Sequence, residues 1–201
     1  MDKREEILLA ALELASQKGL GSVSLGQIAD RVGIKKPSLY NHFSSKDEII
    51  KELYVYLRQK AKSQLPPSPD GISELVKDRS AYEVLMMSVK SYGVMNSDET
   101  MMKFYRVIYS QRSLDPTAAQ IVAEETKKMI AATKALFYAL SAHKKIECDD
   151  IDSAAFSFAM SVHSILDYMT DCKICGQQTD DKMLSDHIKW FCTQIGGQKN
   201  E

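Results

Sequence analysis

The stretches SLGQIADRVGI, residues 24–34, and PSLYNHF, residues 37–43, decide the fold of this chain. Ser24 precedes Gln27 by three residues, the spacing of a capping box, so we expect a helix from Leu25 to Val32 that ends at Gly33. Proline suits the first turn of a helix, and the second stretch therefore predicts a helix over residues 37–43. Two short helices joined by a tight turn that contains glycine form the helix-turn-helix pattern.

The residues around the turn meet the geometric demands of this motif. Steeply crossing helices need a small residue where they touch, and Ala29 is such a residue. The turn needs a residue that tolerates a positive φ, as Gly33 does. The side chains expected in the shared core are Ile28, Val32, Ile34 and Leu39. The second short helix is then free to lie in a DNA major groove.

Two further helices are expected to flank the motif. The first runs from Lys3 to Lys18 and ends at Gly19, because glycine commonly follows the last helical residue. A longer fourth helix begins at about Lys46, behind a second capping box formed by Ser45 and Glu48.

Beyond this region the apolar residues recur at helical spacing, which predicts an all-α protein. The run LPPSPDG, residues 65–71, should interrupt the fourth helix and mark a domain junction. Other breaks are expected at residues 96–98, 114–116, 147–150 and 176–180, with Asp115 capping a helix that has Pro116 in its first turn. Eight to ten helices follow from these breaks, and the longest beyond the junction should lie near 120–145, 150–175 and 180–195. We therefore predict an N-terminal three-helix helix-turn-helix domain over 1–46, a connecting helix over about 46–64, and a C-terminal helical ligand-binding and dimerisation domain over 65–201.

Charge is distributed unevenly along the chain. The 201 residues carry a net charge of −1, but residues 31–46 contain four basic side chains and no acidic one. Residues 65–201 hold 15 Lys or Arg and 19 Asp or Glu, a net charge of −4. This asymmetry predicts that the first segment faces a polyanion. No apolar run approaches the ~18 residues of a membrane span, and the charged N-terminus lacks the apolar segment of a signal peptide, so we expect a cytoplasmic protein without membrane contact.

The run QIADRVGI at 27–34, the run PSLYNHF at 37–43 and the run SKDE at 45–48 together resemble the DNA-binding domain of TetR-type regulators. The resemblance covers residues 5 to 55, and its specific part is the Leu-Tyr-x-His-Phe run followed by Ser-Lys-Asp-Glu. Beyond residue 65 only the length and the helicity agree with that family. The resemblance implies a DNA-binding transcriptional regulator, a homodimeric repressor that a small-molecule effector releases from a palindromic double-stranded DNA operator.

The resemblance also implies which residues would touch DNA. The groups that would contact phosphates are Tyr40, His42, Lys46 and the backbone amides near Ser24. Those that would face base edges are Lys36, Pro37 and Asn41, with Ser38 suited to either task. Lys35 belongs to the same DNA-facing set, although Lys35 and Lys36 would also fit a solvated pair.

The C-terminal helices are expected to supply the dimer interface and the effector pocket. The candidate interface helices span 150–175 and 180–195, where the apolar candidates are Phe156, Met160, Ile165, Met169, Trp190, Phe191 and Ile195. Methionine and tyrosine side chains suit an adaptable pocket. The candidate ligand-binding residues are Tyr92, Met102, Tyr105, Tyr109, Phe137, Tyr138 and His163. The same residues suit a plain core, and the expectation of a pocket rests mainly on the resemblance.

Other functions find less support in the sequence. It contains no HExxH motif, no glycine-rich phosphate loop and no catalytic triad motif, so we expect no enzyme, no cofactor and no metal site. Cys172 and Cys175 have the spacing of a zinc or dithiol pair, to which His187 and Cys192 would have to be added, but two thiols one turn apart also fit a helix as buried small residues. Two alternatives stay open: an effector-independent architectural DNA-binding protein of the same fold, and a thiol- or metal-responsive regulator that uses Cys172 and Cys175.

Overall fold

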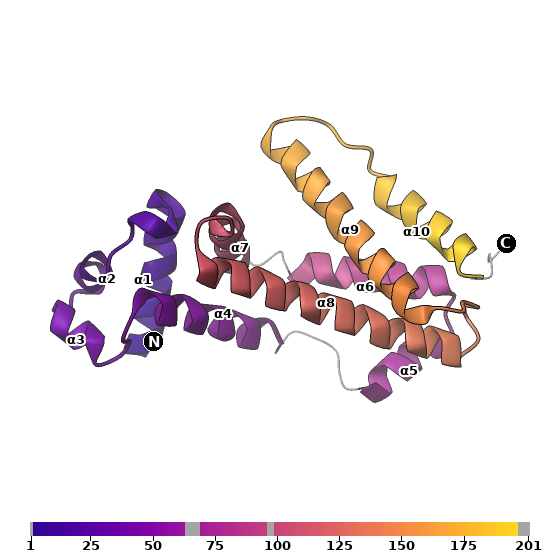
Figure 1. Cartoon of the computed structure of the whole chain (residues 1–201), viewed down its shortest axis with the longest axis horizontal. Helices are drawn as coiled ribbons and strands as arrows, with labels where there is room; N and C mark the ends of the chain where they lie inside the picture. The colour runs from indigo at the N-terminus through magenta and orange to yellow at the C-terminus, as the bar shows by residue number, and fades with distance from the viewer. Residues whose placement is uncertain (1, 63–68, 96–98, 197–201) are drawn as a thin grey trace. The chain divides into compact units, whose positions relative to one another are not determined.

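The computed structural model describes residues 2–62, 69–95 and 99–196, and the side chains of 60–62, 69–70 and 92–95 are not described. Within these ranges the chain forms ten α-helices and one short 3₁₀ helix, with no strand, which confirms the all-α prediction (Figure 1). No helix in the described ranges combines the length and the apolar character needed to cross a membrane.

The helices form two compact units. The first unit comprises α1 (Lys3–Lys18), η1 (Leu20–Ser22), α2 (Leu25–Val32), α3 (Lys36–Tyr40), α4 (Lys46–Lys62), α7 (Glu99–Gln111) and α8 (Pro116–Ala142) as far as Glu125. The second unit comprises α5 (Pro69–Lys77), α6 (Ala81–Met95), α8 from Thr126 onward, α9 (Ile151–Ile174) and α10 (Met183–Gln194). Packing thus groups α7 and the start of α8 with the N-terminal helices, and the functional division at residues 46 and 65 stays a prediction.

The core of the first unit forms where α1 packs on α2, α4 and α7. Its fully buried side chains come from the inner faces of these helices and include Ile7, Ile28, Leu39, Phe43, Ile49, Leu53, Phe104 and Ile108. α1 presents apolar residues at positions 7, 8, 11, 12, 14 and 15, the spacing of one helix face, and all six are buried. This core holds the short helices α2 and α3 in place.

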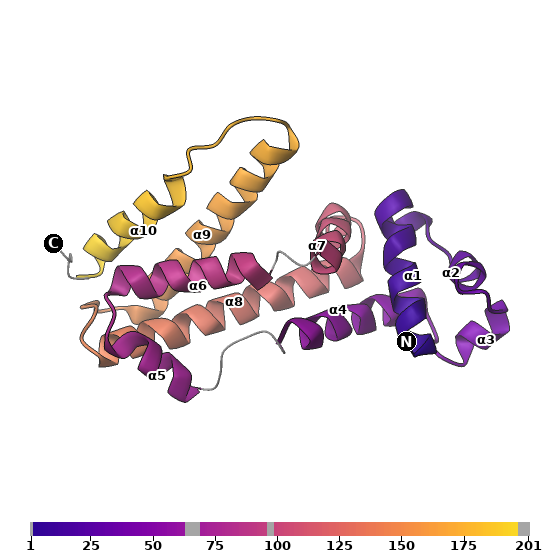
Figure 2. The same ribbon diagram turned by 180° about the vertical axis from the view of Figure 1, so that it is seen from behind.

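The core of the second unit is built around three phenylalanines. Phe158 of α9 has its ring centroid 5.6 Å from that of Phe137 of α8 and 5.1 Å from that of Phe191 of α10. α9 and α10 run side by side in opposite directions (Figure 2). Aromatic pairs at these distances favour tilted or edge-to-face geometry, as seen here.

Most of the predicted boundaries are confirmed, and three expectations are wrong. α3 spans five residues instead of 37–43, because the chain tightens after Tyr40: the His42 and Phe43 amides both donate to the Leu39 carbonyl, which brings Phe43 into the core. Residues 69–71 lie in α5 and not in a break, because a proline can open a helix. With 12 residues, α10 is shorter than α6 and α7, so the segment 180–195 is not among the longest helices. The predicted break at 96–98 lies outside the described residues.

Candidate nucleic-acid interface

α2 is fixed at both ends by the residues that predicted it. The Ser24 side chain accepts a hydrogen bond from the Gln27 amide, and the Gln27 side chain accepts one from the Ser24 amide at 2.9 Å, so the capping box is complete. Gly33 adopts the left-handed conformation with φ 73° and ψ 31°, and its amide donates back to the Ala29 and Asp30 carbonyls. The direction of α3 is therefore set by a glycine that an L-residue would replace only at a cost.

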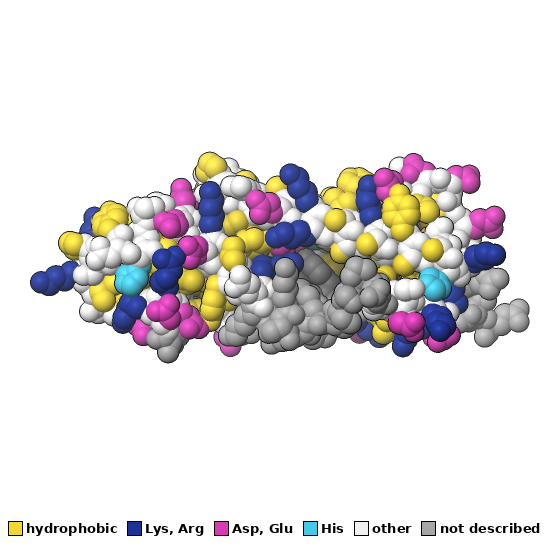
Figure 3. All heavy atoms as spheres, turned by 90° about the horizontal axis from the view of Figure 1, so that it is seen from below, with side chains coloured by type: hydrophobic (Ala, Val, Ile, Leu, Met, Phe, Trp, Pro, Cys, Tyr) yellow, Lys and Arg dark blue, Asp and Glu magenta, His cyan; other side chains and the backbone are white. Residues whose placement is uncertain are grey.

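α3 presents nearly all of its side chains to solvent. Only Leu39 is buried, at 0% exposure, while Tyr40 is 49% exposed. The predicted DNA-facing residues that are exposed are Ser24, Lys35, Lys36, Pro37, Ser38, Tyr40 and Asn41. Basic side chains protrude at the end of the first unit that carries α2 and α3 (Figure 3). The helix is thus a short exposed rod held by one apolar anchor.

Arg4 of α1 holds the turn that follows α3, a role that the sequence analysis missed. Its guanidinium donates to the His42 carbonyl at 2.7 Å and to the Glu52 carboxylate at 2.6 Å. The same group lies over the Phe43 ring, 4.4 Å from its centroid. The hydrogen bond with Glu52 raises the pKa of Arg4. Arg4 connects α1, the turn and α4, and it fixes the backbone that carries His42.

Lys46 is held at a second point behind the interface. Its ammonium donates to the Leu20 carbonyl at 2.9 Å, and the residue is half-buried. An ammonium has three donors, so this bond positions the group without using it up. Ser45 caps α4 by accepting a hydrogen bond from the Glu48 amide at 3.1 Å, as the second capping box predicts. The Glu48 carboxylate in turn accepts hydrogen bonds from the amide and the hydroxyl of Ser44.

A partly buried charged cluster ties α4 to α7 and α8 within the first unit. Glu125 of α8 accepts hydrogen bonds from Tyr54 and, at 2.8 Å, from Tyr105, and its carboxylate lies 3.3 Å from the Arg58 guanidinium. The side chains of Glu125 and Arg58 are only 10% and 19% exposed. Burial, together with the bond to Glu125, raises the pKa of Tyr54. One carboxylate thus connects α8 to α4.

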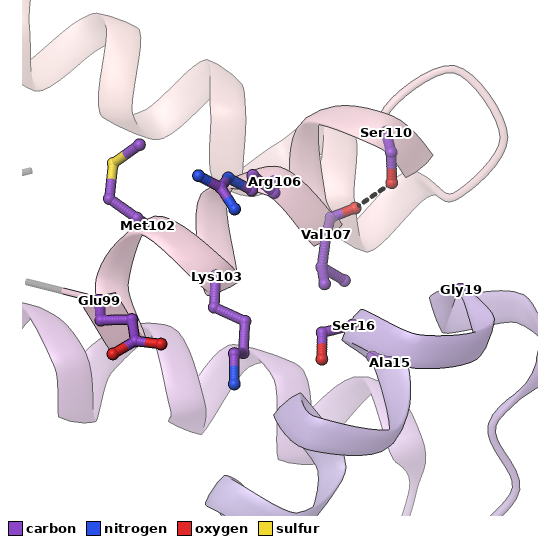
Figure 4. A pocket seen from close by; sticks show the side chains of 9 residues that line it. All are labelled: Ala15, Ser16, Gly19, Glu99, Met102, Lys103, Arg106, Val107 and Ser110. Carbon is purple, nitrogen blue, oxygen red and sulfur yellow. Dashed lines mark hydrogen bonds between the residues drawn. The ribbon is translucent and has the colours of Figure 1, made fainter. Parts of the chain in front are cut away.

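Two cavities lie away from α3, one in each unit. The cavity of the first unit has a volume of about 430 Å³ and lies between the end of α1 and α7, where charged side chains of both signs line it (Figure 4). One of them, Lys103, donates to the Glu13 carboxylate at 2.8 Å. The cavity of the second unit has a volume of about 160 Å³ and is lined mainly by apolar side chains of α6, α8 and α9. Ligand sites are mostly apolar with a few polar groups, which fits the second cavity better.

The predicted ligand-binding residues are divided between the two units. Met102, Tyr105 and Tyr109 belong to the first unit, where Met102 lines the charged cavity and Tyr105 bonds to Glu125. In the second unit Phe137 is a fully buried core residue and Tyr138 is 53% exposed, whereas His163 lines the apolar cavity. The Tyr92 side chain lies outside the described residues. The cavity residues that the prediction missed, such as Ala132 and Thr133, are small and carry no distinctive sequence signal.

The C-terminal pair of helices has both buried and exposed apolar residues. Phe191 and Ile195 are buried in the core of the second unit, so they are not available as interface residues. Phe156 and Trp190 are 48% and 57% exposed. Met160, Ile165 and Met169 are half-buried. An apolar surface of this kind is what an interface with a second copy requires.

The cysteines do not gather into a ligand set. Cys172 is buried and Cys175 exposed, while His187 shares a hydrogen bond of 2.8 Å with Ser161. Cys192 lies in the core, where burial raises the pKa of its thiol to about 11. Among the residues that the structure describes, no three His, Cys, Asp or Glu side chains are arranged to hold a metal ion.

Comparisons with known proteins cover both units. Residues 7–53 match the model of bacterial regulatory proteins of the tetR family, and residues 83–189 match the C-terminal domain of AefR-like transcriptional repressors. The transcriptional activator FasR of Mycolicibacterium smegmatis is 44% identical over 48 residues, which are 24% of this chain and 22% of FasR. The regulator AcrR of Shigella flexneri is 40% identical over 53 residues, 26% of this chain and 25% of AcrR. The chain thus matches about a quarter of the length of these curated relatives.

Solved structures resemble the chain over nearly its whole length. The flavonoid-responsive regulator FrrA superposes with a TM-score of 0.71 at 20% identity, covering 98% of each chain. A regulator of the TetR family from Agrobacterium tumefaciens gives a TM-score of 0.61 at 21% identity, covering 97% of this chain and 98% of its own. At these identities the likeness concerns the fold alone.

Proposed function

The chain belongs to the TetR family of bacterial regulatory proteins, and from this premise we propose that it is a DNA-binding transcriptional regulator that reads its operator with α3. The observation that carries the proposal is the exposure of α3. Its basic and polar side chains face solvent around the single buried residue Leu39, in a stretch from Arg31 to Lys46 without an acidic residue. A short, exposed and positively charged helix is what a major groove accepts.

The residues divide into two roles in this proposal. Tyr40, His42, Lys46 and the amides near Ser24 bind phosphates, which gives affinity without sequence preference. Lys36 donates to guanine, Asn41 pairs with adenine, and Pro37 and Ser38 lie at the base edges beside Lys35. Lys46 suits its role because the Leu20 carbonyl already positions its ammonium.

The regulator acts as a homodimer on a palindromic operator. One α3 reads one half-site, and two copies about one turn of DNA apart, ~34 Å or a multiple, multiply the specificity. The exposed apolar side chains of α9 and α10, with Phe156 and Trp190 as the largest, supply the interface. The match of residues 83–189 to a repressor domain favours repression.

A small-molecule effector in the apolar cavity of the second unit releases the operator. Met129 lines that cavity, and Glu125, four residues earlier on the same helix α8, holds Tyr54 and Arg58 of α4. An effector that binds better to a conformation with a shifted α8 therefore changes the contacts that hold α4. The population of the conformation that fits the operator falls as a result.

Two lysine variants test the division of roles once an operator has been selected from random duplexes. Lys46→Ala should weaken binding to the operator and to random duplex alike and lower the salt slope by about one unit. Lys36→Ala should weaken binding to the operator by about 5- to 150-fold more than binding to random duplex, which corresponds to ~1–3 kcal/mol. Lys77→Ala, which removes an exposed charge in α5, serves as the control. Equal losses for both variants on both DNAs would refute the assignment.

A further inference from the structure

We propose that the cavity of the second unit binds a neutral molecule of the phenol class, one aromatic ring with one hydroxyl group. The regulatory consequence, though not the ligand class, rests on the proposed effector-responsive function. Three features of the cavity support this assignment: its size, the absence of charged side chains among the described residues of its walls, and the kind of polar group that its walls offer.

The size of the cavity fits a single ring. Its volume is about 160 Å³, and its apolar walls include Val89, Leu136, Phe158, Val162 and Leu166. An engineered cavity of ~150 Å³ with similar leucine, isoleucine and phenylalanine walls stays dry and binds benzene.

The walls of the cavity disfavour an anionic ligand. None of the described residues that line the cavity is a Lys, Arg, Asp or Glu, and His163 is the one titratable residue among them. Its Nε2 lies 3.6 Å from the carboxylate of Asp167, which would repel an anion. A ligand carboxylate would lose its hydration without gaining an opposite charge, which is costly.

The polar groups of the walls select a ligand that donates a hydrogen bond. The Ser88 hydroxyl donates to the Leu85 carbonyl at 2.8 Å, and the Thr133 hydroxyl donates to the Met129 carbonyl at 2.9 Å. Both hydroxyl protons are thus engaged within their own helices, and the oxygens are left with lone pairs as acceptors. A single hydroxyl on the ring supplies the matching donor, and the apolar walls contact the rest of the molecule.

Calorimetric titration of the full-length protein with phenol, benzoate and benzene tests this assignment. We expect phenol to bind saturably and benzoate to bind at least about 10-fold more weakly, because burying its charge is costly. The double variant S88A/T133V removes both acceptors. It should weaken the binding of phenol by about 3- to 10-fold and leave the binding of benzene unchanged. Benzoate that binds as tightly as phenol, or no detectable phenol binding at millimolar concentration, would overturn the assignment.

A matched pair of variants locates the binding site. Ala132 lines the cavity at its exposed rim, whereas its neighbour Ala131 is exposed and does not line it. Ala132→Phe should fill the cavity and weaken the binding of phenol at least about 10-fold, whereas Ala131→Phe should leave the binding of phenol unchanged. Equal phenol binding in both variants would overturn the site.

Operator binding measured with and without phenol keeps the two proposals distinguishable. If phenol binds and is sensitive to Ala132→Phe but does not alter operator affinity, the ligand class stands and release by an effector fails. If phenol does not bind while the operator does, the ligand class fails and the DNA-binding function stands.

Discussion

Replacement of Arg4 by alanine should both destabilise the first unit and weaken DNA binding. The lost interactions are a charged hydrogen bond to the His42 carbonyl, worth ~1.5–3 kcal/mol, and a cation–π contact with Phe43, worth ~0.5–1 kcal/mol. The ion pair with Glu52 adds little, about 0–1 kcal/mol, because both side chains are about 40% exposed. Since the guanidinium is itself partly exposed, we expect a loss of about 2–3 kcal/mol, measured by urea unfolding followed by circular dichroism.

The effect on DNA binding follows from the backbone that Arg4 holds. Without it the turn carrying His42 must be ordered when DNA binds, and ordering one residue costs ~1–2 kcal/mol, or about a 5- to 30-fold loss of affinity. Lys3→Ala is the matched control, because it removes the neighbouring exposed pair with Glu6 and should cost below about 0.5 kcal/mol. If fluorescence anisotropy showed unchanged DNA affinity in a folded Arg4→Ala protein, Arg4 would be a structural residue only.

Three further outcomes follow from the structure. Gly33→Ala should cost ~1–2 kcal/mol in thermal or urea unfolding, because φ is 73° at this position, although an added Cβ would meet no other atom. Gly26→Ala, inside the helix α2 that Gly33 follows, should be neutral or stabilising, and equal effects of the two substitutions would contradict the strain argument. Tyr54→Phe should lower the urea midpoint by an amount equivalent to ~1 kcal/mol, and an unchanged midpoint would mean that its bond to the α8 carboxylate contributes nothing. Lys103 holds the pKa of Glu13 below its ordinary value of 4.5. The resulting contribution to the free energy of unfolding is complete above that pH and is lost as the pH falls through the lowered pKa. Glu13→Gln should therefore flatten the acid dependence of stability, and a profile identical to that of the unmodified protein would refute this contribution.

The sequence predicted local structure well where the signal is local. The Ser24 and Gln27 box, the glycine that ends α2 and the Asp115 cap, whose carboxylate accepts from the Ala118 amide at 2.9 Å, are contained within a few residues each. The length of α3 was overestimated because the position of Phe43 depends on the core and on Arg4, which is far away in the chain. Propensity alone does not contain such a tertiary constraint.

The candidate sites were predicted unevenly for the same reason. The residues proposed to face DNA all lie between Ser24 and Lys46, so one pattern in the sequence suffices to propose them together. The apolar cavity is assembled from α6, α8 and α9, and most of the residues that line it are common small and aliphatic ones that carry no distinctive signal in the sequence. Position along a helix face, and not residue type, decides which of them border empty space.

In α3, which is five residues long, Leu39 is the only buried side chain, so the residue that folds the motif is separate from those proposed to read a DNA sequence. Exposed substitutions away from special features usually change stability by less than about 0.5 kcal/mol. New operator preferences can therefore arise by exchanging surface positions of α3 one at a time, each intermediate remaining folded. A lineage of such regulators can diversify its targets while its scaffold stays the same.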